Sequence, residues 1–568
     1  MINSPPGLNA RAYSLGRRDQ QIERLRTEQF DLLVIGGGIT GAGIALDAAT
    51  RGLKVALVEK SDFASGTSSR STKLIHGGLR YLAQFHFRLT REALSERSVL
   101  QKLAPHLVEP IPFLFPIYHK RLEVWRVNTG LWLYDLMAGL RRTKLHRRLS
   151  RQDTLARMPQ LNPEGLRASF VYYDSRTDDA RLVVEVLKAA VANGAAIANY
   201  LMADRILTKE GRATGVAARD VLGEATFDIR AHKVVVAAGV WLDHVLDGGE
   251  PTGRRRVRPA KGVHLVVPRE RLGGDLAVVF PTPDDRLMFV IPWQGATLIG
   301  TTDTDYTGPL DEPRADRADV DYILKVVNST FPGVELSDAD VISLQAGLRP
   351  LVDNGGDETA KVSREDRVFE NPDGSIAIAG GKLTTYRQMG RKVVDLAVRR
   401  LGEEGFLRRR PHSRTRDVPL GGFPERSRRR ISRLIRRRKV RLTPPDTVGM
   451  PWLNPARAQR LWRSYGANWR AVVDTATDPA LGEPVLPGLD VIKAEIVFAA
   501  RYEMACTLID VLARRTHLAL LDRDQARAAA PLVASLLARE LGWSAEEEAR
   551  QLAQYYRQVE QFSIGAVH

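Results

Sequence analysis

Short apolar runs alternate with glycine turns and amphipathic stretches along the first part of the chain. Residues 32–35 form a continuous apolar run, which is typical of a parallel strand buried on both faces. The glycine-rich residues 36–41 follow, and they open a stretch over 42–51 with the composition of a helix. Residues 54–59 are again mostly apolar and predict a second strand. The order of strand, glycine turn, helix and strand predicts a βαβ half-unit.

The apolar pattern changes further along the chain. Apolar residues recur on one helical face near 87–104, which predicts a helix. Between about 105 and 345, proline and glycine interrupt short apolar runs, which favours mixed or antiparallel strands. Two runs, 233–239 and 375–381, end in small residues and are expected to return to the first sheet. From about 410 the chain is rich in Arg and Pro and then strongly helical, which predicts an all-helical C-terminal domain.

The glycines between the first two predicted strands have the spacing of a dinucleotide site. Gly36, Gly38 and Gly41 form a Gly-x-Gly-x-x-Gly pattern, which allows a tight turn, close approach to a pyrophosphate and close packing of helix on strand. Glu59 ends the second strand, where a carboxylate is placed to bind the ribose hydroxyls of an adenosine. This register predicts dinucleotide binding, and NAD and FAD both fit it.

Composition limits the possibilities. The chain has 568 residues, 44% of them apolar and 27% charged, as in ordinary soluble globular proteins, and its length predicts two or three domains. The single cysteine, Cys506, excludes an internal disulfide and a multi-cysteine zinc cage, and we expect it to be a small buried residue in a reducing cytosol. No apolar run approaches the ~18 to 20 residues of a membrane-spanning helix, so any membrane contact is expected to be peripheral. The Arg-rich first thirty residues lack the apolar core of a secretory signal.

The formal net charge of +17 is compatible with nucleic acid, an anionic membrane or an anionic substrate as partner. Much of the excess lies in 426–441, where Ile431, Leu434 and Ile435 fall at helical spacing within an Arg-rich run. Such a segment either lies on anionic lipid head groups or forms a solvated surface helix, and the sequence leaves both open. Nucleic acid is not expected as a partner, because it would explain the charge but not the dinucleotide motif.

The segment 67–81 decides between the two dinucleotides. Its sequence, Thr-Ser-Ser-Arg-Ser-Thr-Lys-Leu-Ile-His-Gly-Gly-Leu-Arg-Tyr, closely resembles the FAD-dependent glycerol-3-phosphate dehydrogenases, within the glycine-oxidase and D-amino-acid-oxidase-like flavoproteins. One departure lies at 237–241, where Ala-Ala-Gly-Val-Trp replaces the family's Ala-Thr-Gly-Pro-Trp and a threonine is lost. The resemblance continues in order through 173–174, 178–182, 289–293, 299–303, 347–351 and 380–387, and less distinctively through 500–505 and 510–516.

The resemblance and the apolar pattern together predict an α/β chain, α+β overall. We expect an N-terminal extension over 1–28, an FAD-dependent oxidoreductase region over 29–410 and a helical C-terminal domain over 411–568. Within the oxidoreductase region, a Rossmann-type FAD-binding domain is expected at about 29–104, 150–245 and 345–410, and a substrate domain with a mixed or antiparallel sheet at about 105–149 and 246–344.

The resemblance implies oxidation of sn-glycerol 3-phosphate to dihydroxyacetone phosphate, with hydride transfer from C2 to flavin N5 and electrons passed to a membrane quinone. It also implies a cytoplasmic enzyme in peripheral contact with the anionic inner face of the cell membrane. A glycerol-3-phosphate oxidase that reduces oxygen to H2O2 is the alternative. An amino-acid or amine oxidase is disfavoured, because the cations Arg80, Arg349 and Lys382 suit a phosphate. The oligomeric state stays open, with a homodimer as one option.

The expected substrate pocket is cationic, because glycerol 3-phosphate is a dianion near neutral pH. By resemblance, Arg80 and Arg349 bind the phosphate through planar guanidinium groups, and Lys382 lies near the substrate oxygens. Tyr81 and Thr302 are expected to hydrogen-bond the substrate.

A base is required to accept the proton of the C2 hydroxyl. His76 is the expected base, because the ordinary histidine pKa near ~6.5 suits proton uptake at cytosolic pH. Lys382 or water is the alternative, and His76 would then only pack against the isoalloxazine ring. No metal is expected, because the chain has no paired Cys/His spacing. The FAD contacts are expected from Gly36, Gly38, Gly41, Glu59, Thr67, Ser68, Ser69, Lys73, Leu74, His76, Gly239, Trp241, Gly380, Gly381, Leu383 and Thr384.

Overall fold

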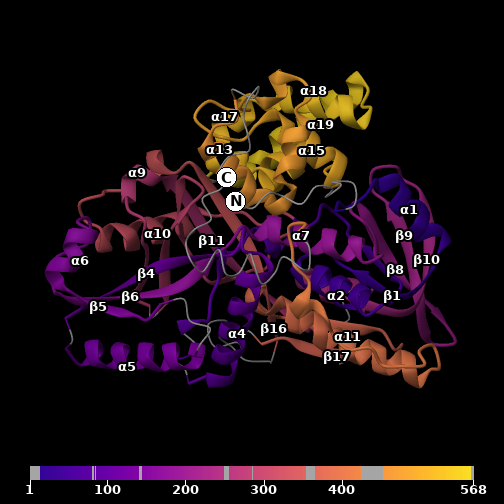
Figure 1. The fold of residues 1–568 in the computed structure, drawn as a ribbon, viewed down its shortest axis with the longest axis horizontal. Coiled ribbons are helices and arrows are strands. Elements are labelled where there is room, and N and C mark those ends of the chain that lie inside the picture. The colour runs from indigo at the N-terminus through magenta and orange to yellow at the C-terminus, as the bar shows by residue number, and fades with distance from the viewer. Residues whose placement is uncertain are drawn as a thin grey trace.

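The computed structural model describes residues 13–79, 82, 85–119, 121–139, 144–248, 255–284, 286–353, 365–423 and 452–564. Two bodies that contain sheets lie side by side, and helices of the C-terminal part cover them from above (Figure 1). The predicted fold class is confirmed: one sheet is mainly parallel, the other is mixed, and the C-terminal part is helical.

The nucleotide sheet is the mainly parallel one. Strands β18, β10, β1, β2 and β7 are parallel to one another, and β17 pairs antiparallel with β18 at the edge. Strands β8 (Leu201–Lys209) and β9 (Arg212–Asp220) belong to the same sheet, where β9 pairs antiparallel with both β10 and β8. In spatial order the sheet runs β17 (Arg367–Glu370), β18 (Ile376–Ala379), β10 (Thr226–Val236), β1 (Gln29–Ile35), β2 (Val55–Val58) and β7 (Ala196–Ala198).

Strand β1 is buried on both faces, as its continuous apolar run predicts. Leu32 and Val34 join a core with helices α2 (Ile39–Thr50), α7 (Asp179–Ala192) and α11 (Tyr386–Glu403). Leu33 and Ile35 point into a second core that contains Leu25 of helix α1 (Arg18–Thr27). The predicted βαβ half-unit is therefore confirmed as β1, α2 and β2.

The substrate sheet is mixed, with β12 and β4 parallel and the other pairs antiparallel. Helix α10 (Arg317–Thr330) packs on one face, and α4 (Phe87–Leu103) and α5 (Arg121–Ala138) pack on the other. Its spatial order is β15 (Thr304–Asp305), β11 (Val257–Pro268), β14 (Ala296–Gly300), β13 (Leu287–Trp293), β12 (Ala277–Pro281), β4 (Glu109–Tyr118), β6 (Leu166–Arg176) and β3 (Leu74–Ile75), with β16 (Ser343–Val352) on β11 and β5 (Arg147–Ser150) on β6.

Three strands of the substrate sheet differ from the expected division of the chain. Strands β3 and β6, and most of β16, fall inside the blocks of about 29–104, 150–245 and 345–410 that we assigned to the nucleotide-binding domain, yet all three pair in the substrate sheet. Strand β3 has only two residues, and β6 and β16 mix buried apolar residues with polar ones, so none of the three carries a local signal for the sheet in which it will pair. The chain therefore crosses between the two sheets more often than composition suggests.

The C-terminal domain packs against the substrate sheet, because Val266, Trp293 and Leu298 of that sheet share a core with its helices. The segment Asp510–Arg515 forms a π-helical turn. Cys506, expected to be buried, is only partly buried.

No helix of the described ranges is long and apolar enough to cross a membrane. The helices are α13 (Pro455–Tyr465), α14 (Trp469–Thr475), α15 (Lys493–Tyr502), α16 (Leu518–Leu521), α17 (Arg523–Ala528), α18 (Ala530–Leu541) and α19 (Ala545–Val559).

Buried His106 gives folding a pH dependence. Burial, followed by the positive charges of Arg181 and Lys188, lowers the pKa of His106 to about 3. Between pH 6.5 and that value the unfolded chain binds a proton that the folded chain does not, so stability falls as pH falls. The expected slope is ~1.4 kcal/mol per pH unit for this histidine. His106→Leu should flatten the pH dependence of urea unfolding between pH 6.5 and 5, and an unchanged slope would contradict the burial of a neutral ring.

Candidate functional site

The turn after β1 is shaped by glycine. Gly36 has a φ of 112°, and a Cβ on Gly41 would lie 1.9 Å from the carbonyl oxygen of Gly36. The turn therefore brings the backbone directly to the N-terminus of α2, whose amide groups and dipole favour an anion. Glu59 is bonded to this turn. Its Oε2 accepts a hydrogen bond from the amide of Gly37 at 2.6 Å, and its Oε1 accepts one from the amide of Ser61 at 2.9 Å.

The nucleotide cavity, of about 920 Å³, opens beside this turn. The hydroxyl of Ser68 reaches the N-terminus of α2, where its Oγ accepts from the amide of Ile39 at 2.9 Å. Glycines, amide donors and a carboxylate at the end of β2 form the donor set that a dinucleotide requires, so the residues fit FAD. The expected contacts that line this cavity are Gly36, Gly38, Glu59, Thr67, Ser68, Gly239, Trp241, Gly380, Gly381 and Leu383, together with Lys382.

Not every expected FAD contact lines this cavity. The ammonium of Lys73 is fully buried in an ion pair with Asp179 at 2.7 Å and donates to the carbonyl oxygen of Ser69 at 3.1 Å. These bonds occupy Lys73, so the structure places it as a support of the 67–74 segment. Gly41, Ser69 and Thr384 also stay off the lining, and Leu74 and His76 line a second cavity instead.

The substrate-side cavity is small, about 70 Å³, and its wall mixes aromatic and charged groups. Phe113, Tyr172 and Phe289 form the apolar part. The polar part consists of His76, Asp174, Arg286, Thr301, Asp303 and Arg349.

Arg349 is held in a fixed orientation. Its Nη1 donates to Oδ1 of Asp303 at 2.7 Å, and its Nη2 donates to Oγ1 of Thr301 at 3.0 Å. Gly262 on the adjacent strand leaves room for it, because a Cβ there would lie 2.5 Å from Nη2. The guanidinium, with a side chain 21% exposed, is thus aimed into the cavity by its neighbours.

Thr302, expected to bind substrate, points elsewhere. Its side chain is buried, and its Oγ1 accepts from the amide of Val263 at 3.0 Å. The neighbouring Thr301 lines the cavity in its place. Sequence spacing places both threonines near the site but does not say which of two adjacent side chains faces it.

His76 lines the substrate-side cavity and contacts the segment 380–384. Its amide donates to Oγ1 of Thr384 at 3.2 Å, which ties it to the 380–384 segment beside the nucleotide cavity. Its ring lies edge-on to Phe289, with ring centroids 6.5 Å apart. The expected partners Arg80 and Tyr81 lie outside the described residues.

Asp174 and Arg286 are residues that the sequence did not single out. Asp174 is buried; it accepts from the amide of Gly77 at 3.2 Å and pairs with Arg97, so it fixes the turn next to His76. Arg286 brings a second guanidinium to the cavity wall. Asp174 stood in a block that resembled the family, whereas no signal marked Arg286.

Three comparisons with known proteins agree with one another. Residues 31–396 match the family model described as FAD dependent oxidoreductase, and residues 413–548 match the C-terminal domain of alpha-glycerophosphate oxidase. The chain is 41% identical to glycerol-3-phosphate dehydrogenase 2 of Mycobacterium tuberculosis over 98% of this chain and 92% of the relative. It is 37% identical to the aerobic glycerol-3-phosphate dehydrogenase of Bacillus subtilis over 95% of this chain and 96% of the relative.

Solved structures give the same result. The glycerol-3-phosphate dehydrogenase of Bacillus halodurans, complexed with FAD, superposes with a TM-score of 0.78 at 33% identity and covers 98% of this chain and 100% of its own. Glycine oxidase of Geobacillus kaustophilus shares the fold, with a TM-score of 0.51 at 21% identity over 67% of this chain and 100% of its own.

Proposed function

Since this chain belongs to the family of FAD-dependent glycerol-3-phosphate dehydrogenases, we propose that it oxidises sn-glycerol 3-phosphate to dihydroxyacetone phosphate and passes the electrons to a membrane quinone. The observation that carries the proposal is the substrate-side cavity, which is lined by both the oriented guanidinium of Arg349 and His76. A cation for phosphate and a base for a hydroxyl are the two groups that this reaction needs.

The phosphate is proposed to bind at the guanidinium end of this cavity. Hydrogen bonds to Asp303 and Thr301 already hold the guanidinium of Arg349 in place, so the side chain loses little conformational freedom when the phosphate binds. Arg286 adds positive charge to the same wall, and its Nη1 is fixed by the carbonyl oxygen of Asp303 at 2.9 Å. Lys382 lies in the wall of the nucleotide cavity, and we place it toward the substrate oxygens.

His76 is the proposed base for the proton of the C2 hydroxyl, with Lys382 or water as the alternative acceptor. Bound FAD supplies the acceptor for the C2 hydride. Phe113, Tyr172 and Phe289 exclude water from the wall around the histidine. Asp174 accepts a hydrogen bond from the amide of Gly77 and thereby holds the turn next to His76.

The acceptor distinguishes a dehydrogenase from an oxidase. We expect turnover with glycerol 3-phosphate to reduce a soluble quinone, with H2O2 formed in far less than stoichiometric amounts in air. Stoichiometric H2O2, together with no gain in rate from quinone, would identify the oxidase alternative.

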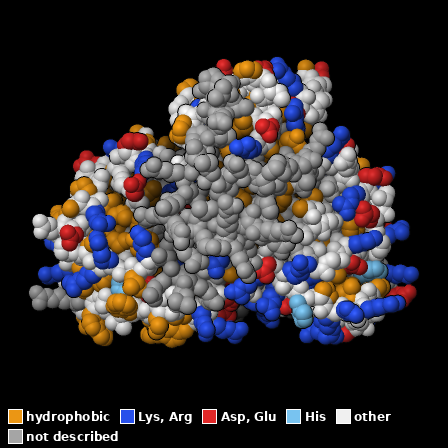
Figure 2. All heavy atoms as spheres, viewed as in Figure 1, with side chains coloured by type: hydrophobic (Ala, Val, Ile, Leu, Met, Phe, Trp, Pro, Cys, Tyr) orange, Lys and Arg blue, Asp and Glu red, His pale blue; other side chains and the backbone are white. Residues whose placement is uncertain are grey.

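Helix α5 offers a surface for the proposed contact with an anionic membrane at the cytoplasmic face. Leu122, Trp125, Trp132 and Leu136 lie on one side of the helix and are 54% to 77% exposed. Figure 2 shows hydrophobic side chains gathered at the lower left, where Figure 1 places α5. A contiguous exposed apolar face with tryptophan is typical of helices that lie in the lipid interface. Exposed cations, which suit anionic head groups, occur on α5, on the adjoining helix α4 and in the segment that follows α5: Arg126, Arg88, Lys144 and Arg147. The segment 426–441 lies outside the described residues.

Replacing Trp125 and Trp132 with serine should weaken binding to vesicles that contain anionic phosphatidylglycerol. Burial of a large side chain contributes ~1.5 to 3 kcal/mol, so two losses predict a fall of about 10²-fold or more in the partition coefficient. Leu532→Ser, at an exposed leucine of α18, is the matched control and should change little. If the double variant and the wild type floated equally with the vesicles, α5 would not be the membrane-binding surface.

A further inference from the structure

The C-terminal helical domain contributes part of the wall of the nucleotide cavity. Arg70, which also lines this cavity, donates from Nη2 to Oε1 of Gln561 at 2.8 Å, so the two parts of the chain are bonded to each other at the cavity. The residues that the C-terminal domain brings to the lining are Ile509, Arg514, Gln554, Arg557, Gln558 and Gln561.

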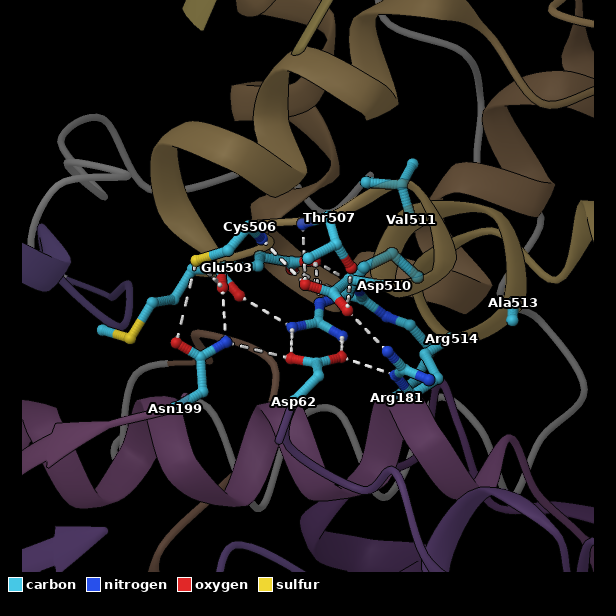
Figure 3. Close-up of polar contacts among 12 residues, drawn as sticks. Asp62, Arg181, Asn199, Glu503, Cys506, Thr507, Asp510, Val511, Ala513 and Arg514 are labelled. Atoms are coloured by element: carbon cyan, nitrogen blue, oxygen red, sulfur yellow. Dashed lines mark hydrogen bonds and ion pairs between the residues drawn. The ribbon is translucent and has the colours of Figure 1, made fainter. Parts of the chain in front are cut away.

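Asp62 connects this domain to the loop that carries Glu59. Its Oδ2 accepts a hydrogen bond from Nε of Arg514 at 2.6 Å (Figure 3). The same oxygen accepts from Nη1 of Arg515 at 2.8 Å, and Oδ1 accepts from Nη2 of Arg515 at 2.9 Å. The side chains of Asp62 and Arg515 are fully buried. A bidentate guanidinium pair in such surroundings fixes both position and direction. The loop 59–62 is therefore held from the C-terminal side.

A second set of bonds holds the same loop. Asn199 donates from Nδ2 to Oδ1 of Asp62 at 3.1 Å and to the carbonyl oxygen of Met504 at 2.8 Å. The amide of the next residue, Tyr200, donates a hydrogen bond to the carbonyl oxygen of Ser61 at 2.9 Å, and its hydroxyl donates one to Asp510 at 2.6 Å. The 199–200 turn therefore touches the loop and the C-terminal domain at once.

The charges of this contact are balanced and buried. Because the cluster lies in a low dielectric, loss of one charge leaves its partners uncompensated. The carboxylates Glu185, Glu503, Asp62 and Asp510 face the cations Arg181, Lys188, Arg514 and Arg515.

We propose that the C-terminal domain is a clamp on the FAD site: through Arg514 and Arg515 it fixes Asp62, and thereby keeps the 59–62 loop in the position in which Glu59 receives the adenosine half of FAD. FAD retention then depends on a domain outside the nucleotide fold. The proposal rests on the FAD dependence of the family and is independent of the substrate and the electron acceptor.

The test compares two variants of the full-length enzyme, Asp62→Asn and Lys188→Gln. Both remove one charge from the buried cluster, but Lys188 bonds Glu185 and Glu503 and does not touch the 59–62 loop. FAD is titrated into each apoprotein and followed by flavin fluorescence, and urea unfolding of the apoprotein is measured in parallel. We expect both variants to unfold at lower urea, whereas only Asp62→Asn raises the Kd for FAD, by about tenfold or more, as expected when a buried ion pair is broken.

Two results would overturn the clamp. One is an FAD Kd for Asp62→Asn within about threefold of the wild type, and the other is equal loss of FAD affinity in both variants, which would mark general destabilisation. If Asp62→Asn does not fold, Tyr200→Phe removes only the hydroxyl, which bonds Asp510 and Thr507 of the C-terminal domain, and should still speed FAD dissociation. No glycerol 3-phosphate is present in these titrations, so a wrong substrate assignment would leave their outcome unchanged.

Discussion

Replacing Arg349 with alanine is expected to lower kcat/KM for glycerol 3-phosphate by about 10²- to 10⁴-fold, since two charge-assisted hydrogen bonds contribute ~1.5 to 3 kcal/mol each. The loss should be largest for the phosphorylated substrate, because the guanidinium is proposed to bind the phosphate. Steady-state rates with a soluble quinone measure the effect. Arg349→Lys should recover part of it, because lysine keeps the charge but lacks the planar fork.

Arg258→Ala is the matched control for Arg349. Arg258 lies on the neighbouring strand β11, where it pairs with Asp305 outside both cavities. We expect kcat/KM of the Arg258→Ala variant to stay within about threefold of the wild type, because this partly exposed ion pair contacts neither cavity. If the two variants lost activity equally, the phosphate role of Arg349 would be wrong.

Replacing His76 with asparagine is expected to slow anaerobic reduction of the flavin by about 10²- to 10⁴-fold, the usual contribution of a positioned general base. Binding of FAD should be preserved, because the histidine meets the 380–384 segment through its backbone amide. Stopped-flow absorbance after mixing with glycerol 3-phosphate measures the rate.

His119→Asn is the control for His76. His119 lies beyond the end of β4 with a φ of 59°, a backbone conformation that asparagine tolerates, and it lines neither of the two cavities. An unchanged rate of flavin reduction in the His76 variant would show that Lys382 or water, and not His76, accepts the proton.

Local signals in the sequence were enough to predict the βαβ half-unit of the nucleotide-binding domain. The apolar run 32–35, the glycines and Glu59 are close in the chain, and each has one strong physical reading. The helix predicted near 87–104 is present as α4 for the same reason, since its apolar face is a local pattern. Sheet membership is not local, so the pairing of β6 and β16 in the substrate sheet escaped prediction.

The candidate site was predictable only to the level of segments. Residues of the blocks around 67–81, 299–303 and 347–351 do line the two cavities. The sequence did not predict that Lys73 forms an ion pair with Asp179, or that Thr301 rather than Thr302 lines the substrate-side cavity. Such facts depend on the direction of single side chains. Asp62 illustrates the limit most clearly, because its two arginine partners are about 450 positions away in the chain.

The central claim is that this flavoenzyme oxidises glycerol 3-phosphate, and anaerobic mixing of the purified yellow protein with that substrate tests it most directly. We predict bleaching of the flavin band near ~450 nm within the first turnover, because the hydride leaves the substrate for the bound flavin. A protein that binds FAD but does not bleach would contradict the substrate assignment, and a colourless protein that binds no FAD would contradict the whole account.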